Sequence, residues 1–148
     1  MNAYSFKDTS LVLSFATGSF TVNGGKVGIG GFTLRNMTER SAMLVGADGG
    51  VTISYVAGDN AEMDIETQQS SDLHRFLIQT FNQLKTAADN GDPTTWASGS
   101  STWRSLVDRR SGVIQGLVFT KIPDEPRGAQ AQNVTWRFMA GDSQQQAA

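Results

Sequence analysis

The chain has 148 residues, which is enough for one well-buried core and too few to expect two domains. Its formal net charge of −2 does not indicate a general nucleic-acid binder, and the absence of cysteine excludes disulfides and thiolate metal sites. No window approaches the apolar length of a membrane span, and the first eight residues lack the apolar core of a signal peptide. We therefore expect one soluble domain over residues 1–148 that is not exported by a cleaved signal.

The first part of the chain predicts strands separated by glycine turns. Alternating apolar residues indicate a strand over 10–16, a return strand over 19–23, and a third strand over 32–37. The segment 27–31 holds too many glycines for the core of a stable strand, so we expect a bulge or a close backbone approach there.

A hairpin follows. The turn 46–50 places an Asp-Gly pair between apolar runs, which favours a type I′ turn with positive φ at both central residues. The outgoing strand alternates, and we expect the face that carries Val51, Ile53 and Tyr55 to be buried.

The next strand, residues 62–67, has apolar side chains on one face and three carboxylates on the other. These carboxylates, called the acidic row below, belong to Glu62, Asp64 and Glu66. They invite a glycosidase or calcium-site interpretation, yet side chains two apart on a strand lie roughly 6.5–7 Å apart, so the three do not form a cage. The plainer interpretation is the water-facing side of a half-buried strand.

One helix is predicted from about Asp72 to Ala88, because apolar residues recur at spacings of three and four. Ser71 suits the N-cap, and Asn90-Gly91 offers a left-handed stop. We expect the single histidine, His74, to be a solvated residue on the helix surface. As a metal ligand it would need partners that only carboxylates could supply.

The remainder of the chain returns to strands. Trp96 and Trp103 lie at the two ends of a polar loop, where they could cover the end of a barrel or anchor an interface; we favour the covering role. The pattern over 102–109 fits a short strand or a helical turn equally well. Strands are predicted over 113–122 and 133–139. From about residue 141 the chain is a polar tail without packing residues, which we expect to be mobile.

Taken together, the order of these signals resembles bacteriophage tail tube proteins of the myovirus type. The segments that carry the resemblance are Tyr4 to Asp8, Gly31 to Thr33, Met37 to Glu39, Met43, Gly46 to Gly49, Ala57-Gly58, Phe119 to Asp124 and Trp136 to Gly141. The segment from Asn90 to Asp108 matches least.

The resemblance implies a mainly β fold, namely a small antiparallel β-barrel or sandwich of two packed sheets with one flanking α-helix. It implies a structural, non-enzymatic protein of the virion without a cofactor. Hexameric rings of this subunit would stack into a hollow tube of a contractile tail, and the lumen would conduct DNA during ejection. The protein would be made in the host bacterial cytoplasm. A type VI secretion-like tube subunit would share this architecture, so the fold alone does not separate the two.

Under this resemblance the partners would be copies of the chain itself, the tail sheath, the tape-measure and baseplate proteins, and DNA in transit. No membrane and no small-molecule substrate would be involved. Six copies of the acidic row would repel passing DNA, whereas a basic wall would bind phosphates. The lumen-facing candidates are Glu62, Asp64 and Glu66. The hairpin would be the arm that reaches the next ring. The candidates for inter-ring or inter-subunit contacts are Arg35, Glu39, Arg40, Met43, Asp48 and Gly49.

Two hypotheses from other classes are open at this point. A monomeric β-barrel could bind a small apolar ligand, with the helix beside its mouth. A carboxylate-dependent hydrolase is the weaker hypothesis, because no acid–base constellation is evident and one histidine leaves little room for a serine-type triad.

Overall fold

The computed structural model describes residue 5, residues 8–23 and residues 29–147. Strands dominate these ranges, and one long helix accompanies them. In chain order the elements are β1 (Thr9–Phe15), β2 (Gly18–Asn23), β3 (Ile29–Asn36), β4 (Ser41–Val45), β5 (Val51–Tyr55), β6 (Ala61–Gln68), α1 (Asp72–Asp89), α2 (Pro93–Trp96), β7 (Gly99–Ser105), β8 (Arg110–Phe119), β9 (Asn133–Ala140) and β10 (Asp142–Ala147).

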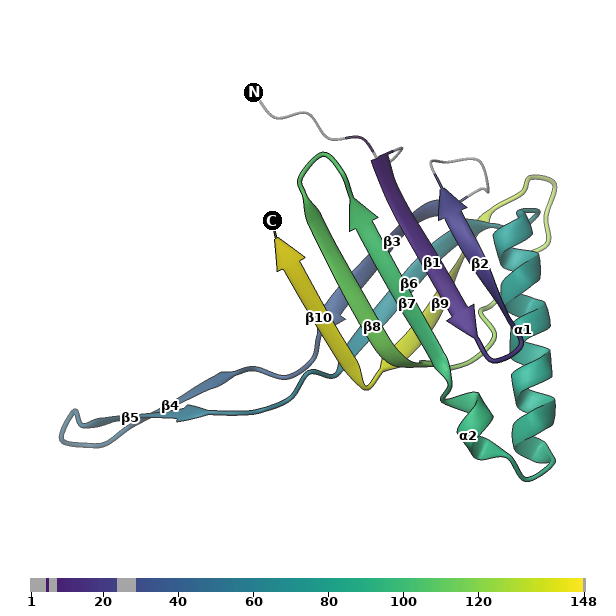
Figure 1. Cartoon of the computed structure of the whole chain (residues 1–148). Helices are drawn as coiled ribbons and strands as arrows, with labels where there is room; N and C mark the ends of the chain where they lie inside the picture. Colours follow the sequence, from purple (N-terminus) through teal and green to yellow (C-terminus); the bar gives the residue numbers. More distant parts are fainter. Residues whose placement is uncertain (1–4, 6–7, 24–28, 148) are drawn as a thin grey trace.

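The strands form two antiparallel sheets that lie one behind the other, with α1 along one side (Figure 1). Sheet A has the order β10-β8-β7-β1-β2, and sheet B has the order β9-β6-β3. The end of β8 joins them, because Val118 and Phe119 pair with β9. No ladder closes β2 onto β3 within the described residues, so the sheets do not form a closed barrel. The predicted mainly β fold of two sheets and one main helix is confirmed in its sandwich form.

The core lies between the sheets because each strand buries alternate residues. Strands β6 and β9 show this alternation along almost their whole length. The largest fully buried side chains include Trp136, Phe138, Leu11, Leu13, Met63 and Ile65. Trp96 and Trp103 are partly buried and pack against this core; Trp103 lies within β7.

Two uncertain segments of the sequence resolve as strands. A register shift between Ile29 and Gly31 against β6 confirms a bulge in the part of segment 27–31 that the structure describes; residues 27 and 28 lie outside it. The segment 102–109 continues β7 (Gly99–Ser105), which pairs with β1 and β8, and then turns over residues 106–109.

Helix α1 begins and ends where its capping residues predict. Ser71 has an extended backbone, and its Oγ accepts a hydrogen bond from the backbone N–H of His74 at 3.1 Å. Asn90 is the C-cap, and Gly91 follows with φ of +94°. The helix buries Leu73, Leu77 and Leu84, and it lies beside β2 and β6.

The C-terminal segment is a strand in place of the expected mobile tail. Residues 142–147 form β10, which pairs in register with β8 from Asp142 opposite Gln115 to Ala147 opposite Arg110. Its sequence is polar, so side-chain patterning gives no strand signal. The ladder needs only backbone groups, and β8 supplies an edge for them.

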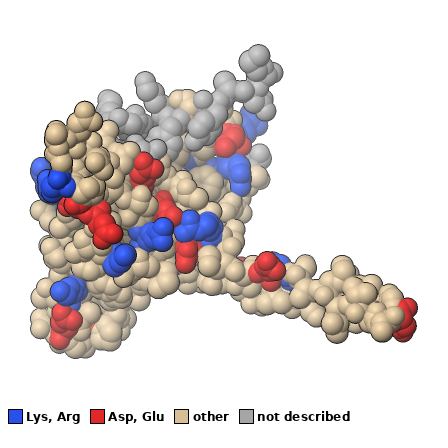
Figure 2. Space-filling view, turned by 180° about the vertical axis from the view of Figure 1, so that it is seen from behind, with Lys and Arg blue, Asp and Glu red and all other residues tan. Residues whose placement is uncertain are grey.

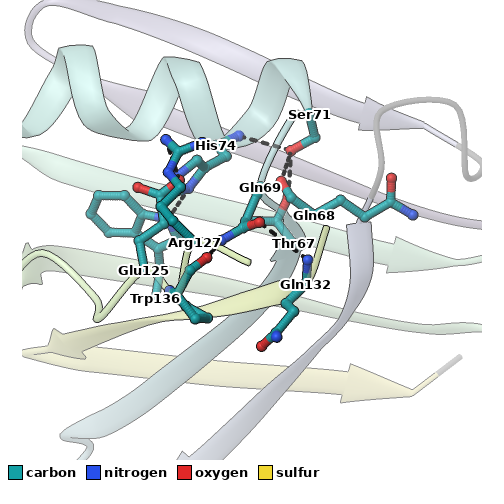
Figure 3. Close-up of polar contacts among 10 residues, drawn as sticks. Thr67, Gln68, Gln69, Ser71, His74, Glu125, Arg127, Gln132 and Trp136 are labelled. Carbon is teal, nitrogen blue, oxygen red and sulfur yellow. Dashed lines mark hydrogen bonds and ion pairs between the residues drawn. The ribbon is translucent and has the colours of Figure 1, made fainter. Parts of the chain in front are cut away.

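His74 is buried, so the prediction of a solvated surface residue is wrong. Its side chain points under the loop that precedes β9, beside Trp136 (Figure 3). Trp136 Nε1 donates a hydrogen bond to His74 Nδ1 at 3.0 Å, which leaves the other ring nitrogen, Nε2, to carry the hydrogen of a neutral imidazole. Glu125 Oε1 lies 3.6 Å from that Nε2 and 3.1 Å from a guanidinium nitrogen of Arg127.

Gln69 fastens the loop over this buried imidazole. Its backbone N–H donates to the carbonyl of Gln132 at 3.2 Å, and its side-chain oxygen accepts from the backbone N–H of Gln132 at 3.1 Å. Its side-chain nitrogen also donates to the carbonyl of Pro126. These bonds hold residues 126 and 132 against the end of β6 (Figure 3).

Phe119 is the meeting point of the core. Its ring stacks on Phe15 of sheet A at 5.3 Å between centroids and lies 4.8 Å from Phe138 of sheet B. It also meets Trp136 at 5.5 Å, Phe81 of α1 at 5.6 Å and Trp96 of α2 at 6.3 Å. One side chain therefore contacts both sheets and both helices.

Replacing Phe119 with Ala should lower the free energy of unfolding by about 3–5 kcal/mol, because the cavity would separate four elements at once. Urea denaturation of the purified protein measures this. Val113→Ala on the exposed side of the same strand is the matched control and should change stability by about 0.5 kcal/mol or less. Equal losses in the two variants would contradict the central role of Phe119.

Replacing Trp136 with Phe should cost about 1–3 kcal/mol, because it leaves the buried Nδ1 of His74 without a donor. Adding His74→Leu to that variant should restore part of the loss, since both polar partners are then apolar. Urea denaturation of the two single variants and the double variant gives the coupling. A fully additive result would argue against a stabilising hydrogen bond.

Candidate assembly surfaces

The β4–β5 hairpin extends away from the two sheets as an arm (Figure 1). The predicted hairpin is present, and its register sets Met43 opposite Ile53. The turn differs from the predicted type I′, because Gly49 has φ of +85° and Asp48 has no positive φ. Instead, Gly46 and Gly50 close a three-residue loop, and Asp48 Oδ1 accepts from the backbone N–H of Gly50 at 3.0 Å. The last residue of such a three-residue loop adopts the left-handed backbone conformation, which glycine adopts easily.

The arm exposes the apolar face that the sequence analysis expected to be buried. That face, called the apolar arm face below, consists of Met43, Val45, Val51, Ile53 and Tyr55. The exposed fractions are 66% for Met43, 69% for Ile53 and 77% for Tyr55. The other face carries Ala42, Leu44, Thr52 and Ser54. The expectation of burial is wrong because the hairpin has no second layer to lie on.

An exposed apolar hairpin of this kind is typical of an interaction surface. A two-stranded hairpin is marginally stable by itself in water, and monomers rarely expose contiguous apolar side chains. The arm therefore has the character of a segment that a partner covers.

The root of the arm is held by polar contacts within the chain. The Arg40 guanidinium donates to Asp59 and, at 3.1 Å, to the Tyr55 hydroxyl. Gly58 lies so close to Thr38 that an added Cβ would come within 2.7 Å of the threonine hydroxyl. Glu39 is exposed beside this root. Arg40, one of the candidates for inter-ring or inter-subunit contacts, pairs with Asp59 and Tyr55 in its own chain at the root of the arm.

The acidic row lies on the outer face of β6, as alternation predicts, and Arg35 on β3 binds two of its members. Arg35 Nη1 is 2.7 Å from Asp64 Oδ2, and Nη2 is 2.9 Å from Glu62 Oε2. The side-chain hydrogen bonds to Asp64, and then to Glu62, raise the pKa of Arg35. The third member, Glu66, accepts a hydrogen bond from the Asn133 side chain at 2.7 Å.

The structure thus joins Arg35 to the acidic row, whereas the sequence analysis placed them in different contacts. This pairing follows from the register between β3 and β6, which sets Arg35 directly opposite Glu62. On the neighbouring strand β9, the register sets Arg137 opposite Asp64. Basic and acidic side chains are consequently interspersed over the back of the molecule, where sheet B lies (Figure 2).

A second surface at the β7–β8 turn was missed by the sequence analysis. A hollow of about 480 Å³ lies there, lined by Arg104, Ser105, Leu106, Arg109, Arg110 and Ser111. Leu106 is 63% exposed beside it. The sequence shows Arg109 and Arg110 as a pair, and only the strand pairing brings Arg104 to them, opposite Ser111. We call this surface the arginine hollow.

Two other kinds of site find no support in the described ranges. There, no three His, Asp or Glu side chains gather closely enough to hold a metal ion. Among the same residues, no helix is both long and apolar enough to cross a membrane.

Comparisons with solved structures place this fold among contractile injection systems. The anti-feeding prophage cap, the tube terminating cap, matches with a TM-score of 0.60 and 7% identity, over 100% of this chain and 93% of that chain. The anti-feeding prophage baseplate, 6-fold symmetrised, matches with a TM-score of 0.61 and 10% identity, over 99% and 97%. The sheath-tube complex of an extracellular contractile injection system, PVC, in its extended state, matches with 0.55 and 9%, over 93% and 88%. These identities show a likeness of fold.

The comparison with curated proteins finds no match. The comparison with protein families matches residues 1–147 to the bacteriophage PhiTE tail tube protein family. This match spans nearly the whole chain, and the fold agrees with it, so the family expected from the sequence is confirmed. The chain belongs to the bacteriophage PhiTE tail tube protein family and is a structural tube subunit.

Proposed function

We propose that this chain is the repeating subunit of a contractile-tail tube, in which hexameric rings stack and enclose a channel that conducts DNA during ejection. The observation that carries this proposal is the apolar arm face, which is exposed in the single chain and held out from the body by a fixed root. The 6-fold symmetrised baseplate with the same fold supports the ring number.

The arm is the contact between successive rings in this proposal. A contact between different surfaces of identical subunits repeats without closing along an axis, which produces a filament. The arm lies well outside the two sheets (Figure 1), so it reaches a neighbour before the sheets themselves do. Of the predicted contact residues, Met43 lies on the apolar arm face, while Asp48 and Gly49 form the tip.

The outer face of sheet B is the lumen wall in this proposal. Strong repulsion by unpaired carboxylates is no longer the mechanism, since Arg35 offsets Glu62 and Asp64. The two carboxylates instead occupy the guanidinium that would otherwise bind phosphate oxygens. Passing DNA then meets a wall on which the Arg35 charge is already paired, so it slides with little retention.

The other proposed partners follow from the place of a tube subunit within a phage tail. The chain would contact the sheath outside the tube, the tape-measure protein inside it and the baseplate at its end, all within the virion. The solved structures of a sheath-tube complex and a baseplate with this fold support these partners. The alternative of a barrel that binds an apolar ligand is less well supported, because no ladder closes the sheets among the described residues and aromatic rings pack between them.

Replacing Met43 and Ile53 together with Ser should yield a folded protein that no longer forms long tubes. Both side chains are exposed in the single chain, so stability should change little. Each would contribute about 1.5–3 kcal/mol to a contact that buried it fully. Negative-stain electron microscopy and sedimentation velocity measure tube formation, and urea denaturation checks the fold.

Thr52→Ala with Ser54→Ala, on the opposite face of the same hairpin, is the matched control and should leave tubes intact. Tubes of normal length from the Met43→Ser, Ile53→Ser variant would refute the role of the arm.

Replacing Glu62 with Gln and Asp64 with Asn should make assembled tubes retain DNA. The change frees the Arg35 guanidinium on each subunit to bind phosphates. Cosedimentation of short double-stranded DNA with tubes should rise at about 50 mM salt and fall again by about 200 mM, as expected for phosphate contacts.

Asp72→Asn on the exposed start of α1 removes a carboxylate elsewhere and serves as the control for net charge. Unchanged DNA retention in the Glu62→Gln, Asp64→Asn tubes, or a reconstruction that places sheet B on the outside of the tube, would overturn the lumen assignment.

A further inference from the structure

We propose that the arm tip of one subunit docks into the arginine hollow of a second copy, with Asp48 binding the guanidinium groups there. This inference rests on the proposed function, since it names the surface that receives the arm. In this proposal, the contact between subunits is directed by charge, and Arg104 and Arg109 receive the arm tip.

The arginine hollow is a built concave site with an excess of positive charge. It is formed where β7 turns back into β8, and Arg109 in that turn has a positive φ of 57°. Among the residues that the structure describes, Arg104 and Arg109 have no ion-pair partner within 4.0 Å. Arg110 donates to the side chain of Gln145 at 2.8 Å. Asp108 in the same turn and Asp8, whose carbonyl accepts from the backbone N–H of Leu106 at 3.2 Å, carry two negative charges against the three arginine charges.

The arm tip is complementary to this hollow in charge and size. Asp48 is the only charged residue between positions 41 and 58, so a single carboxylate marks the end of an otherwise uncharged arm. Figure 2 shows the arm with its acidic atoms at the tip and near the root. The neighbours of Asp48 in the turn are glycine and alanine, which makes the tip narrow. Asp48 uses one oxygen in the bond to Gly50 and keeps acceptor capacity for an arginine.

Apolar residues extend the match beyond the charges. Val45 and Val51 lie next to the arm tip and are exposed. Leu106 and Val107 beside the hollow are also exposed, so a docked tip would cover apolar surface on both copies. Burial of these groups from water favours the contact and strengthens the ion pair at its centre.

The placement of the two surfaces requires a head-to-tail contact between copies. The arm leaves the body near the end of the sheets where β10 begins, whereas the β7–β8 turn lies at the opposite end of those strands (Figure 1). A tip that docks into the hollow of the next copy leaves that copy's own arm free to reach a third. The contact is therefore heterologous and repeats along an axis.

Charge reversal and charge exchange test the pairing in the full-length chain. Asp48→Lys alone, and Arg104→Glu with Arg109→Glu, should each lose long tubes and leave rings or smaller species in electron micrographs and sedimentation. The variant that combines all three substitutions should regain tubes, because it restores opposite charges across the contact. Wild-type tubes should also shorten at about 1 M salt, where the screening length is about 3 Å.

Two controls separate charge from local folding. Asp48→Asn keeps an acceptor for the Gly50 N–H and removes the charge, so its tubes should be shorter than those of the wild type. Lys85→Glu reverses an exposed charge on α1 and should leave tubes unchanged. Urea midpoints equal to that of the wild type show that each variant is folded.

The outcomes distinguish this inference from the proposed function. Tubes of normal length from the single reversals, or no recovery in the combined variant, would overturn the docking site, while loss of tubes in Met43→Ser, Ile53→Ser would still support the arm. A wild-type protein that forms neither rings nor tubes would overturn both.

Discussion

The contact of Phe119 with rings from β1, β9 and both helices is the constraint on which the remaining structure depends. This residue lies at the end of β8, where the chain passes from sheet A to sheet B, so the same ring that joins the sheets also seats the helices. Aromatic rings pack the interior between the two sheets. The surfaces to which the proposals assign an assembly role, the arm and the arginine hollow, lie on the outside.

Apolar faces that pack against another sheet or helix form the core of this subunit. An apolar face without such a neighbour stays exposed. The apolar residues of β1, β6 and β9 meet each other between the sheets, and their burial stabilises the single chain. The equally apolar face of the β4–β5 hairpin stays largely exposed, with Tyr55 near its root contacted by Arg40. The body therefore buries its own apolar faces, and under the proposed function a neighbouring subunit covers the arm.

The arginine residues also fall into two groups, those paired within the fold and those left unpaired among the described residues. Arg40 uses its guanidinium to hold the arm root, and Arg35 uses its own to tie β3 to the acidic row on β6. Both guanidinium groups form ion pairs within the subunit. Arg104 and Arg109 carry no such internal pairing among the described residues, and they form one of the concave basic surfaces that the single chain leaves open. In the proposed contact, assembly uses cations that are not paired within the described fold.

The amino-acid sequence by itself determined the local features of this protein: the strand alternation, the Ser71 cap, the hairpin around Asp48 and the family. These depend on side-chain period and turn chemistry within a few residues, so they can be read from the chain. Only the tertiary structure decided that His74 is buried under a loop, that a polar tail pairs with β8, that Arg35 faces the acidic row and that the hairpin's apolar face is bare. Each of these depends on which distant segment lies next to the residue, and neither period nor composition encodes that neighbour.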